Sequence, residues 1–225
     1  PHSPTASFYC MIRVNEQRQE REDRKERASG RPLSSEQALQ GTEWLAASSI
    51  LCRQVSFHIP DDESPQDLDG LRVQDCLPST WTAPERSALI ERPLFDSASY
   101  GRMRFHHRRV ADYLAACWIQ KRVVAGMPWS ELEQLFFERR KDRSVLRPSR
   151  AWTAAWLASL SSEDWAIRFR GMLLVHAPHV FLQAGDPERF SSVFKMQVVE
   201  HVVNAFRTRD WRLPDSDAGT LSRLS

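Results

Sequence analysis

Apolar residues recur at helical spacing through most of the second half of the chain. Val110, Tyr113, Leu114, Cys117 and Trp118 fall at positions i, i+3, i+4, i+7 and i+8, so one face of a helix beginning near residue 108 must be buried. Further helices are predicted at residues 130–139, 148–160, 163–176, 178–184 and 191–207. Short polar connectors join them. The pattern predicts a purely helical region over residues 108–213, arranged as an antiparallel, HEAT-like array.

The first half mixes helical and alternating patterns. Residues 34–51 predict a helix with Ser34 or Ser35 as its N-cap and with Glu36 and Gln37 in its first turn. Residues 55–60 alternate in the manner of a short strand. Residues 68–78 and 82–92 each predict a short helix, the second capped by Thr82.

Residues 93–107, PLFDSASYGRMRFHH, predict a β-hairpin. Met103 and Phe105 fall on one face, Arg102 and Arg104 fall on the other, and Gly101 lies in the turn. Helix, strand, helix, helix and hairpin is the element order of a winged-helix domain, here residues 34–107 with the hairpin as the wing. The predicted fold class is therefore mainly α: a winged-helix domain with a small hairpin wing, followed by the helical array.

The two ends of the chain carry little apolar pattern. Residues 13–31 alternate charge signs, so residues 1–33 are predicted to form an exposed, charged helical connector. Residues 214–225 are predicted to be a disordered tail. Because the chain opens at Pro1 without a capped element, we expect it to be a piece of a longer protein.

The composition limits which binding partners and which cellular compartment we expect for this chain. With 31 basic and 29 acidic residues, the net charge of +2 provides no overall field toward nucleic acid or acidic lipid. No apolar run approaches the ~18 residues of a membrane helix and no signal sequence is present, so we expect a cytoplasmic protein without a membrane partner. The cysteines are widely spaced and are interpreted as reduced core residues: Cys10, Cys52, Cys76 and Cys117. Four aromatic residues in consecutive helices are also predicted to be core: Trp152, Trp156, Trp165 and Phe169.

Motifs that carry chemistry are largely missing from the sequence. There is no G-x-x-x-x-G-K-[ST], G-x-S-x-G or H-E-x-x-H pattern. The acidic stretch 61–63 is interpreted as a solvated loop. His176 and His179 are interpreted as structural histidines, because the sequence offers no third metal ligand near them. We therefore predict no catalytic residue and no metal site, and this chain is not expected to be an enzyme. A hydrolase using His106 or His107 as general base remains a third possibility, without a nucleophile placed by a motif.

Residues 101–118, GRMRFHHRRVADYLAACW, contain the strongest candidate site. His106, His107, Arg108 and Arg109 lie at the start of the predicted amphipathic helix. A helix N-terminus offers backbone N–H groups and a positive dipole end, which favour a bound anion such as phosphate. A neutral imidazole can also donate one hydrogen bond to a phosphate oxygen. His107 and Arg108 are therefore the candidate anion-binding residues; the alternative is that these residues simply end a hairpin in water.

The same residues carry a family resemblance. They resemble the F-x-H-x-x-x-x-E-[FY]-[LF]-A-A motif that closes the winged-helix domain of NACHT-type STAND NTPases, the signal-transduction ATPases of innate immunity and bacterial antiphage defence. Asp112 stands where the motif usually has Glu. The matching positions are Phe105, His107, Asp112, Tyr113, Ala115 and Ala116. A weaker similarity extends over residues 31–213.

The resemblance implies a regulatory role. In this family the motif histidine contacts the β-phosphate of ADP and helps hold the resting state, which assigns that role to His107 and a weaker one to Arg108. The P-loop and Walker B motif lie upstream in the family and are absent here, so this fragment alone would hold no cofactor, whereas the parent protein would bind ADP or ATP with Mg²⁺. The implied partners are an upstream NTPase domain in cis, downstream sensor repeats and further copies of the protein on activation, in antiviral defence.

The runner-up interpretation is a winged-helix nucleic-acid-binding module with a helical scaffold. Such a reader presents basic and amide side chains on its third helix. Here residues 84–92 offer Arg86 and Arg92 against Glu85 and Glu91, which is close to neutral. Nucleic acid is therefore not expected as a partner, although this alternative stays open.

Overall fold

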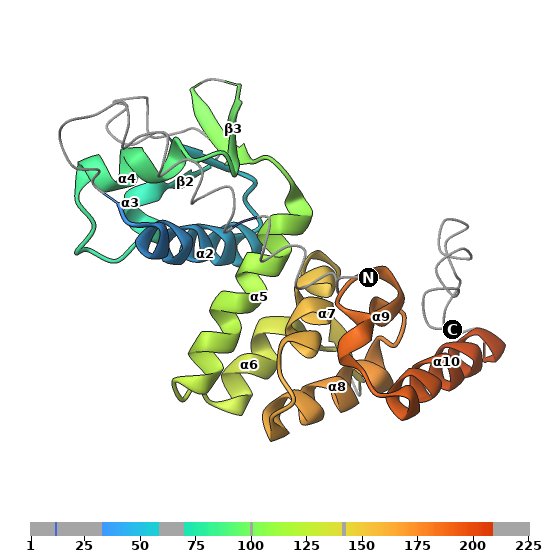
Figure 1. Cartoon of the computed structure of the whole chain (residues 1–225). Coiled ribbons are helices and arrows are strands. Elements are labelled where there is room, and N and C mark those ends of the chain that lie inside the picture. The colour runs from blue at the N-terminus through green and yellow to red at the C-terminus, as the bar shows by residue number, and fades with distance from the viewer. Residues whose placement is uncertain (1–11, 13–32, 59–69, 100, 141–142, 209–225) are drawn as a thin grey trace. The chain divides into compact units, whose positions relative to one another are not determined.

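The computed structural model describes residues 12, 33–58, 70–99, 101–140 and 143–208 (Figure 1). The chain divides into two compact units, residues 6–118 and residues 119–225 together with 1–5, and the division falls inside one helix, α5 (Arg108–Val124). Of the predicted connector 1–33, only Ile12 and Leu33 are described, and both are buried. Cys10, the acidic stretch 61–63 and the predicted tail 214–225 lie outside the described residues.

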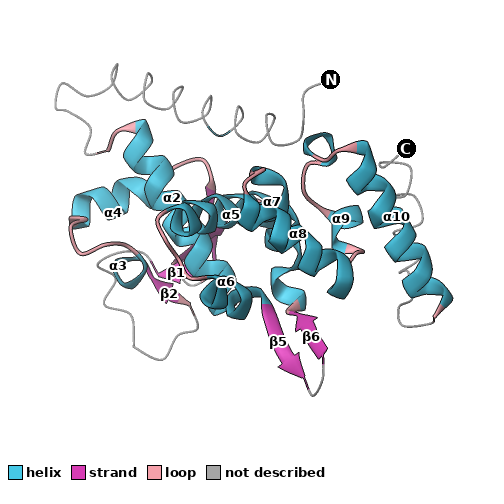
Figure 2. Cartoon of the chain, turned by 90° about the horizontal axis from the view of Figure 1, so that it is seen from below, coloured by secondary structure: helices cyan, strands magenta, loops and turns pink. Residues whose placement is uncertain are grey.

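Helices dominate the described structure, as predicted, and a small mixed sheet accompanies them. The first unit contains α2 (Ser35–Cys52), β1 (Ser56–His58), β2 (Leu71–Arg72), α3 (Val73–Cys76), α4 (Ala83–Ile90), β3 (Phe95–Ala98), β4 (Arg102–Phe105) and the start of α5. The second unit contains the rest of α5, α6 (Trp129–Phe136), β5 (Phe137–Arg140), β6 (Arg143–Leu146), the 3₁₀ turn η1 (Pro148–Arg150), α7 (Ala151–Leu160), α8 (Asp164–His176), α9 (Val180–Gln183), the 3₁₀ turn η2 (Pro187–Arg189) and α10 (Ser192–Arg207) (Figure 2).

Two helices of the first unit begin at the predicted caps. The Ser34 hydroxyl accepts a hydrogen bond from the Gln37 N–H, and the Gln37 side chain accepts one from the Ser34 N–H, which completes a capping box for α2. At α4, the Thr82 N–H donates to a Glu85 carboxylate oxygen at 2.7 Å. This hydrogen bond holds the pKa of Glu85 below its ordinary value.

The sheet of the first unit has the strand order β2-β1-β4-β3. The predicted hairpin is confirmed as β3 and β4, and β1 pairs antiparallel with β4. The helix predicted over residues 68–78 is wrong in its first part, because residues 71–72 form β2, parallel to β1, and only residues 73–76 are helical. Leu71 pairs with Phe57 at the sheet edge, so tertiary pairing overrides the local pattern here.

An aromatic cluster lies on the apolar face of this sheet. Phe57, Phe95 and Phe105 are each buried, and their ring centroids lie 4.7–6.3 Å apart. Edge and tilted ring contacts of this kind add to the free energy gained from burying the rings. The cluster joins the β3–β4 hairpin to β1, from which α3 and α4 separate it in the sequence.

The second unit is not purely helical. The helix predicted over residues 130–139 ends at Phe136, and the chain turns into the antiparallel hairpin β5–β6. Phe137 pairs with Leu146, both side chains are buried, and the Phe137 ring contacts the ring of Phe169 on α8. Continuing α6 would expose Phe137, because the residues that follow it are charged and give a helix no apolar face.

Side chains from three other segments satisfy the last carbonyl groups of α7. Arg170 of α8 donates to the carbonyls of Ala158 and Ser161, and its pKa is lowered by burial and by nearby Arg189. Arg189 of η2 donates to the carbonyls of Ser159 and Leu160. The side chain of Gln120 on α5 donates to the carbonyl of Leu160 as well. A helix end buried inside a unit requires such partners.

The predicted aromatic core is confirmed in part. Trp156 is 4% exposed and Phe169 is fully buried. Trp152 and Trp165 are only half-buried, and the Trp165 indole N–H donates to the carboxylate of Glu163. Residues 153–159 of α7 are all buried, so Trp156 belongs to a helix that the core surrounds on every side.

The cysteine prediction is confirmed for Cys76 and wrong for Cys52. Cys76 is buried and Cys117 is half-buried, whereas Cys52, the last residue of α2, is exposed; all three are free thiols. Burial raises the pKa of the Cys76 thiol. None of the described helices combines the length and the apolar character needed to cross a bilayer.

Replacing Trp156 with Ala should lower the free energy of unfolding by about 3–5 kcal/mol, because removing a buried indole leaves a cavity. Denaturant unfolding followed by circular dichroism measures this change. Trp165→Ala is the matched control, and it should cost clearly less because that side chain is half-exposed. Equal losses for both variants would contradict the assignment of Trp156 to the core.

Alkylation should distinguish the cysteines. At mildly alkaline pH, Cys52 should react with iodoacetamide much faster than Cys76, because only the thiolate reacts and Cys76 combines burial with a raised pKa. Site-resolved mass spectrometry of the folded protein measures both rates, and the same reaction in denaturant should bring the two rates together. Faster labelling of Cys76 in the folded chain would contradict the structure of the α2–α3 region.

Candidate functional site

The site lies where β4 leads into α5. Phe105 ends the strand with its ring in the aromatic cluster, and the His106 N–H donates to the carbonyl of Leu94, which extends the hairpin by one more bond. The carbonyl of His107 then accepts from the N–H groups of Val110 and Ala111, at 3.1 and 3.3 Å. His107 therefore occupies the N-cap position of α5, and its side chain is exposed.

The residues of the family-like motif divide into two sets. Phe105, Tyr113, Ala115 and Ala116 are buried. The Asp112 carboxyl group is 4% exposed and lies 3.4 Å from Nε of Arg108, one helical turn away, while the Arg108 side chain is half-exposed. Thus most of the motif packs the start of α5 into the unit, and His107 is the motif residue that faces solvent.

His106 is tied to the hairpin. Its Nδ1 pairs with the carboxylate of Asp96 on β3, and its ring lies edge-on to the ring of His107 with a centroid separation of 4.1 Å. Asp96 is also the cross-strand partner of Arg104. These contacts limit how far His106 can turn away from the hairpin.

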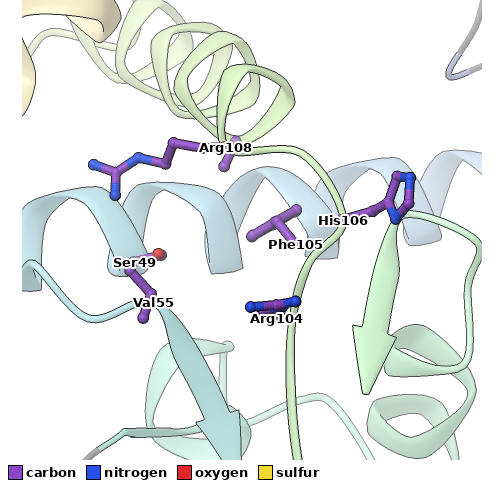
Figure 3. Close-up of a pocket in the computed structure, with 7 residues that line it drawn as sticks. Ser49, Val55, Arg104, Phe105, His106 and Arg108 are labelled. Carbon is purple, nitrogen blue, oxygen red and sulfur yellow. The ribbon is translucent and has the colours of Figure 1, made fainter. Parts of the chain in front are cut away.

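An open pocket of about 350 Å³ lies beside this junction (Figure 3). Arg104, His106 and Arg108 supply its basic groups, and none of its described lining residues is a carboxylate; the others are Ser49, Val55, Phe105 and Ala111. Arg108 reaches from the start of α5 toward Ser49 on α2, while His106 lies on the other side of Phe105 (Figure 3). A second pocket of about 300 Å³ shares Val55 and Arg104 with the first and also includes Arg102.

This arrangement is suited to binding an anion. Two guanidinium groups, an imidazole and the N-terminus of α5 all place hydrogen-bond donors or positive charge near the pocket. The Ser49 hydroxyl donates to the carbonyl of Gln54, so its proton is not directed into the pocket. Among the described residues, no group of three or more His, Cys, Asp or Glu side chains is arranged to hold a metal ion.

The sequence singled out only part of this arrangement. Arg108 lines the pocket, whereas His107 lies next to it at the helix cap and is not a lining residue. Arg104 was predicted to face away from the apolar face of the hairpin, which was the one available signal for its role. Nothing in the sequence indicated that Ser49 and Val55 would line the pocket. They reach it only because α2 and β1 pack beside the hairpin in the folded unit.

The basic residues of the helix predicted over residues 82–92, which corresponds to α4, do not form a surface that could bind nucleic acid. Arg92 is 1% exposed, and Arg86 is half-buried and donates to the carbonyl of Trp81. Neither guanidinium is presented in the way that a phosphate or base contact requires. The burial of Arg92 and the hydrogen bond of Arg86 therefore argue against base recognition by α4.

Comparisons of the chain with protein-family models, curated proteins and solved structures found no match.

Proposed function

We propose that this chain is the regulatory, sensor-proximal part of a NACHT-type STAND signal-transduction ATPase that acts in the cytoplasm, with antiviral defence as its setting. In this proposal residues 34–107 act as a winged-helix-like domain and residues 108–213 begin a HEAT-like helical array. The observation that carries the proposal is the division within the motif at the β4–α5 junction. Its apolar members are buried, while its histidine stands exposed at a helix N-cap.

The backbone of His107 caps α5, whereas its imidazole adds no hydrogen bond to the described structure. Among the described residues, its ring contacts the ring of His106 and makes no hydrogen bond. A polar ring held at a helix N-terminus, with a donor free for a ligand, is suited to a phosphate oxygen. The neighbouring guanidinium groups of Arg104 and Arg108 add to the positive potential there.

In the proposed mechanism this chain supplies one wall of a nucleotide site. An upstream NTPase domain holds ADP or ATP with Mg²⁺, and His107 donates a hydrogen bond to the β-phosphate of ADP. ADP bound in this way favours the closed resting state, because it contacts both domains only when they are together. Sensing through downstream repeats, followed by exchange of ADP for ATP, releases the domains so that copies of the protein assemble. No chemical step is performed by this chain itself.

Replacing His107 with Ala in the parent protein should weaken ADP retention by roughly 10- to 100-fold, since a hydrogen bond to a charged group contributes about 1.5–3 kcal/mol. Ligand-independent activity should rise in parallel. The nucleotide that co-purifies with the protein and its affinity in a displacement titration measure the first effect, and basal signalling output measures the second.

His201→Ala is the matched control, because His201 lies on α10 and, within the described part of the chain, bonds to the carbonyl of Gln197 on its own helix. The control should retain ADP and stay inactive without ligand. If His107→Ala leaves both ADP affinity and basal activity unaltered, the role assigned to His107 is wrong.

A further inference from the structure

The hairpin β5–β6 is the most strongly basic element of the second unit. The described residues between 138 and 147 include four arginines, Arg139, Arg140, Arg143 and Arg147, and one carboxylate, Glu138. The side chains of Arg139, Arg140 and Arg143 are exposed. This local excess of positive charge stands apart from the near-neutral balance of the whole chain.

The base of the hairpin is fixed to the helices. Phe137 and Leu146 are buried, and the Phe137 ring lies 6.4 Å from that of Phe169 and 5.9 Å from that of His176. The Arg147 N–H donates to the carbonyl of Phe136 at 2.8 Å, which closes the base. From there the two strands extend beyond α6 and α8 of the same unit (Figure 2). The arginines are therefore presented on a projecting, anchored ribbon.

The charges on this ribbon are not balanced internally. Arg140 and Arg143 are directly opposite each other in the strand register, and like charges in that position destabilise a hairpin. Glu138 is shared between Arg140 and Arg147, at 3.2 and 3.7 Å. Arg139 and Arg143 have no carboxylate partner among the described residues. A bound polyanion would remove the cost of this repulsion.

We infer that the hairpin β5–β6 is a nucleic-acid-binding arm whose arginines contact the phosphate backbone of a duplex. A two-stranded ribbon fits the width of the major groove, and guanidinium groups bind phosphate oxygens in pairs. Such contacts are independent of base sequence and position the arm on the duplex.

The composition of the hairpin surface favours nucleic acid over an acidic protein. Protein interfaces centre on apolar or aromatic anchors, whereas interfaces with a phosphate backbone are polar and basic. The large apolar side chains that are well exposed in the described part of the chain lie outside the hairpin, and most of them are on α8 and α10. The inference does not depend on the proposed ATPase regulation, because it rests on a different unit and on different residues.

The test is a salt titration of duplex binding by the 225-residue chain, with a fluorescent duplex of about 20 base pairs followed by anisotropy. The logarithm of the association constant should fall linearly with the logarithm of the salt concentration. The double variant Arg139→Gln/Arg143→Gln should bind about tenfold or more weakly at low salt, and its slope should be smaller by about 1.8, because each lost phosphate contact removes about 0.9.

The matched control is Arg53→Gln/Arg207→Gln, which removes the same charge from two exposed arginines on other segments. It should keep the wild-type slope, and circular dichroism should show all three proteins equally folded. The inference is overturned if the hairpin variant keeps the wild-type affinity and slope, or if the control loses as much as the hairpin variant. It is also overturned if polyglutamate competes as well as duplex through the same arginines, since the partner is then an acidic protein.

Discussion

The packing of Phe105 against Phe57 and Phe95 determines where the polar groups of the first unit lie. Successive side chains in a strand point to opposite faces, so holding Phe105 inward turns Arg104 outward. A slip of one residue in the β3–β4 register would exchange these two side chains. The same contact fixes the end of β4, and α5 begins three residues later. The position of His107, the orientation of Arg108 and the pocket that Arg104 and Arg108 line therefore follow from one aromatic cluster.

Elements defined by local patterns were predictable from the sequence. The N-caps of α2 and α4 depend on residues three positions apart, and the β3–β4 hairpin depends on one alternating segment around Gly101. The start of α5 and the burial of its apolar face also follow from spacing alone. In each case the information lies within about one helical turn or one hairpin, which is the range that periodicity reports.

Features that depend on distant partners were not predictable. β2 is two residues long and exists because β1 is beside it, so residues 68–78 considered alone favour a helix. The β5–β6 hairpin depends on Phe137 and Leu146 meeting across charged residues, with Phe169 supplied by a later helix. The pocket beside the motif likewise draws Ser49 and Val55 from outside the hairpin. The concentration of basic residues at the junction could be predicted from the sequence, but the shape of the pocket beside it could not.

The end of α7 links the folding of the second unit to the order in which the chain is synthesised. Its terminal carbonyls are satisfied by Gln120, which precedes α7, and by Arg170 and Arg189, which follow it. A nascent chain that has emerged only as far as α7 has one of these three partners, and the set is complete only after η2 has left the ribosome. The first unit ends at Trp118, within α5. During synthesis the end of α7 therefore lacks two of its three side-chain partners until the later segments have emerged, and in that interval water or a chaperone must satisfy those carbonyl groups.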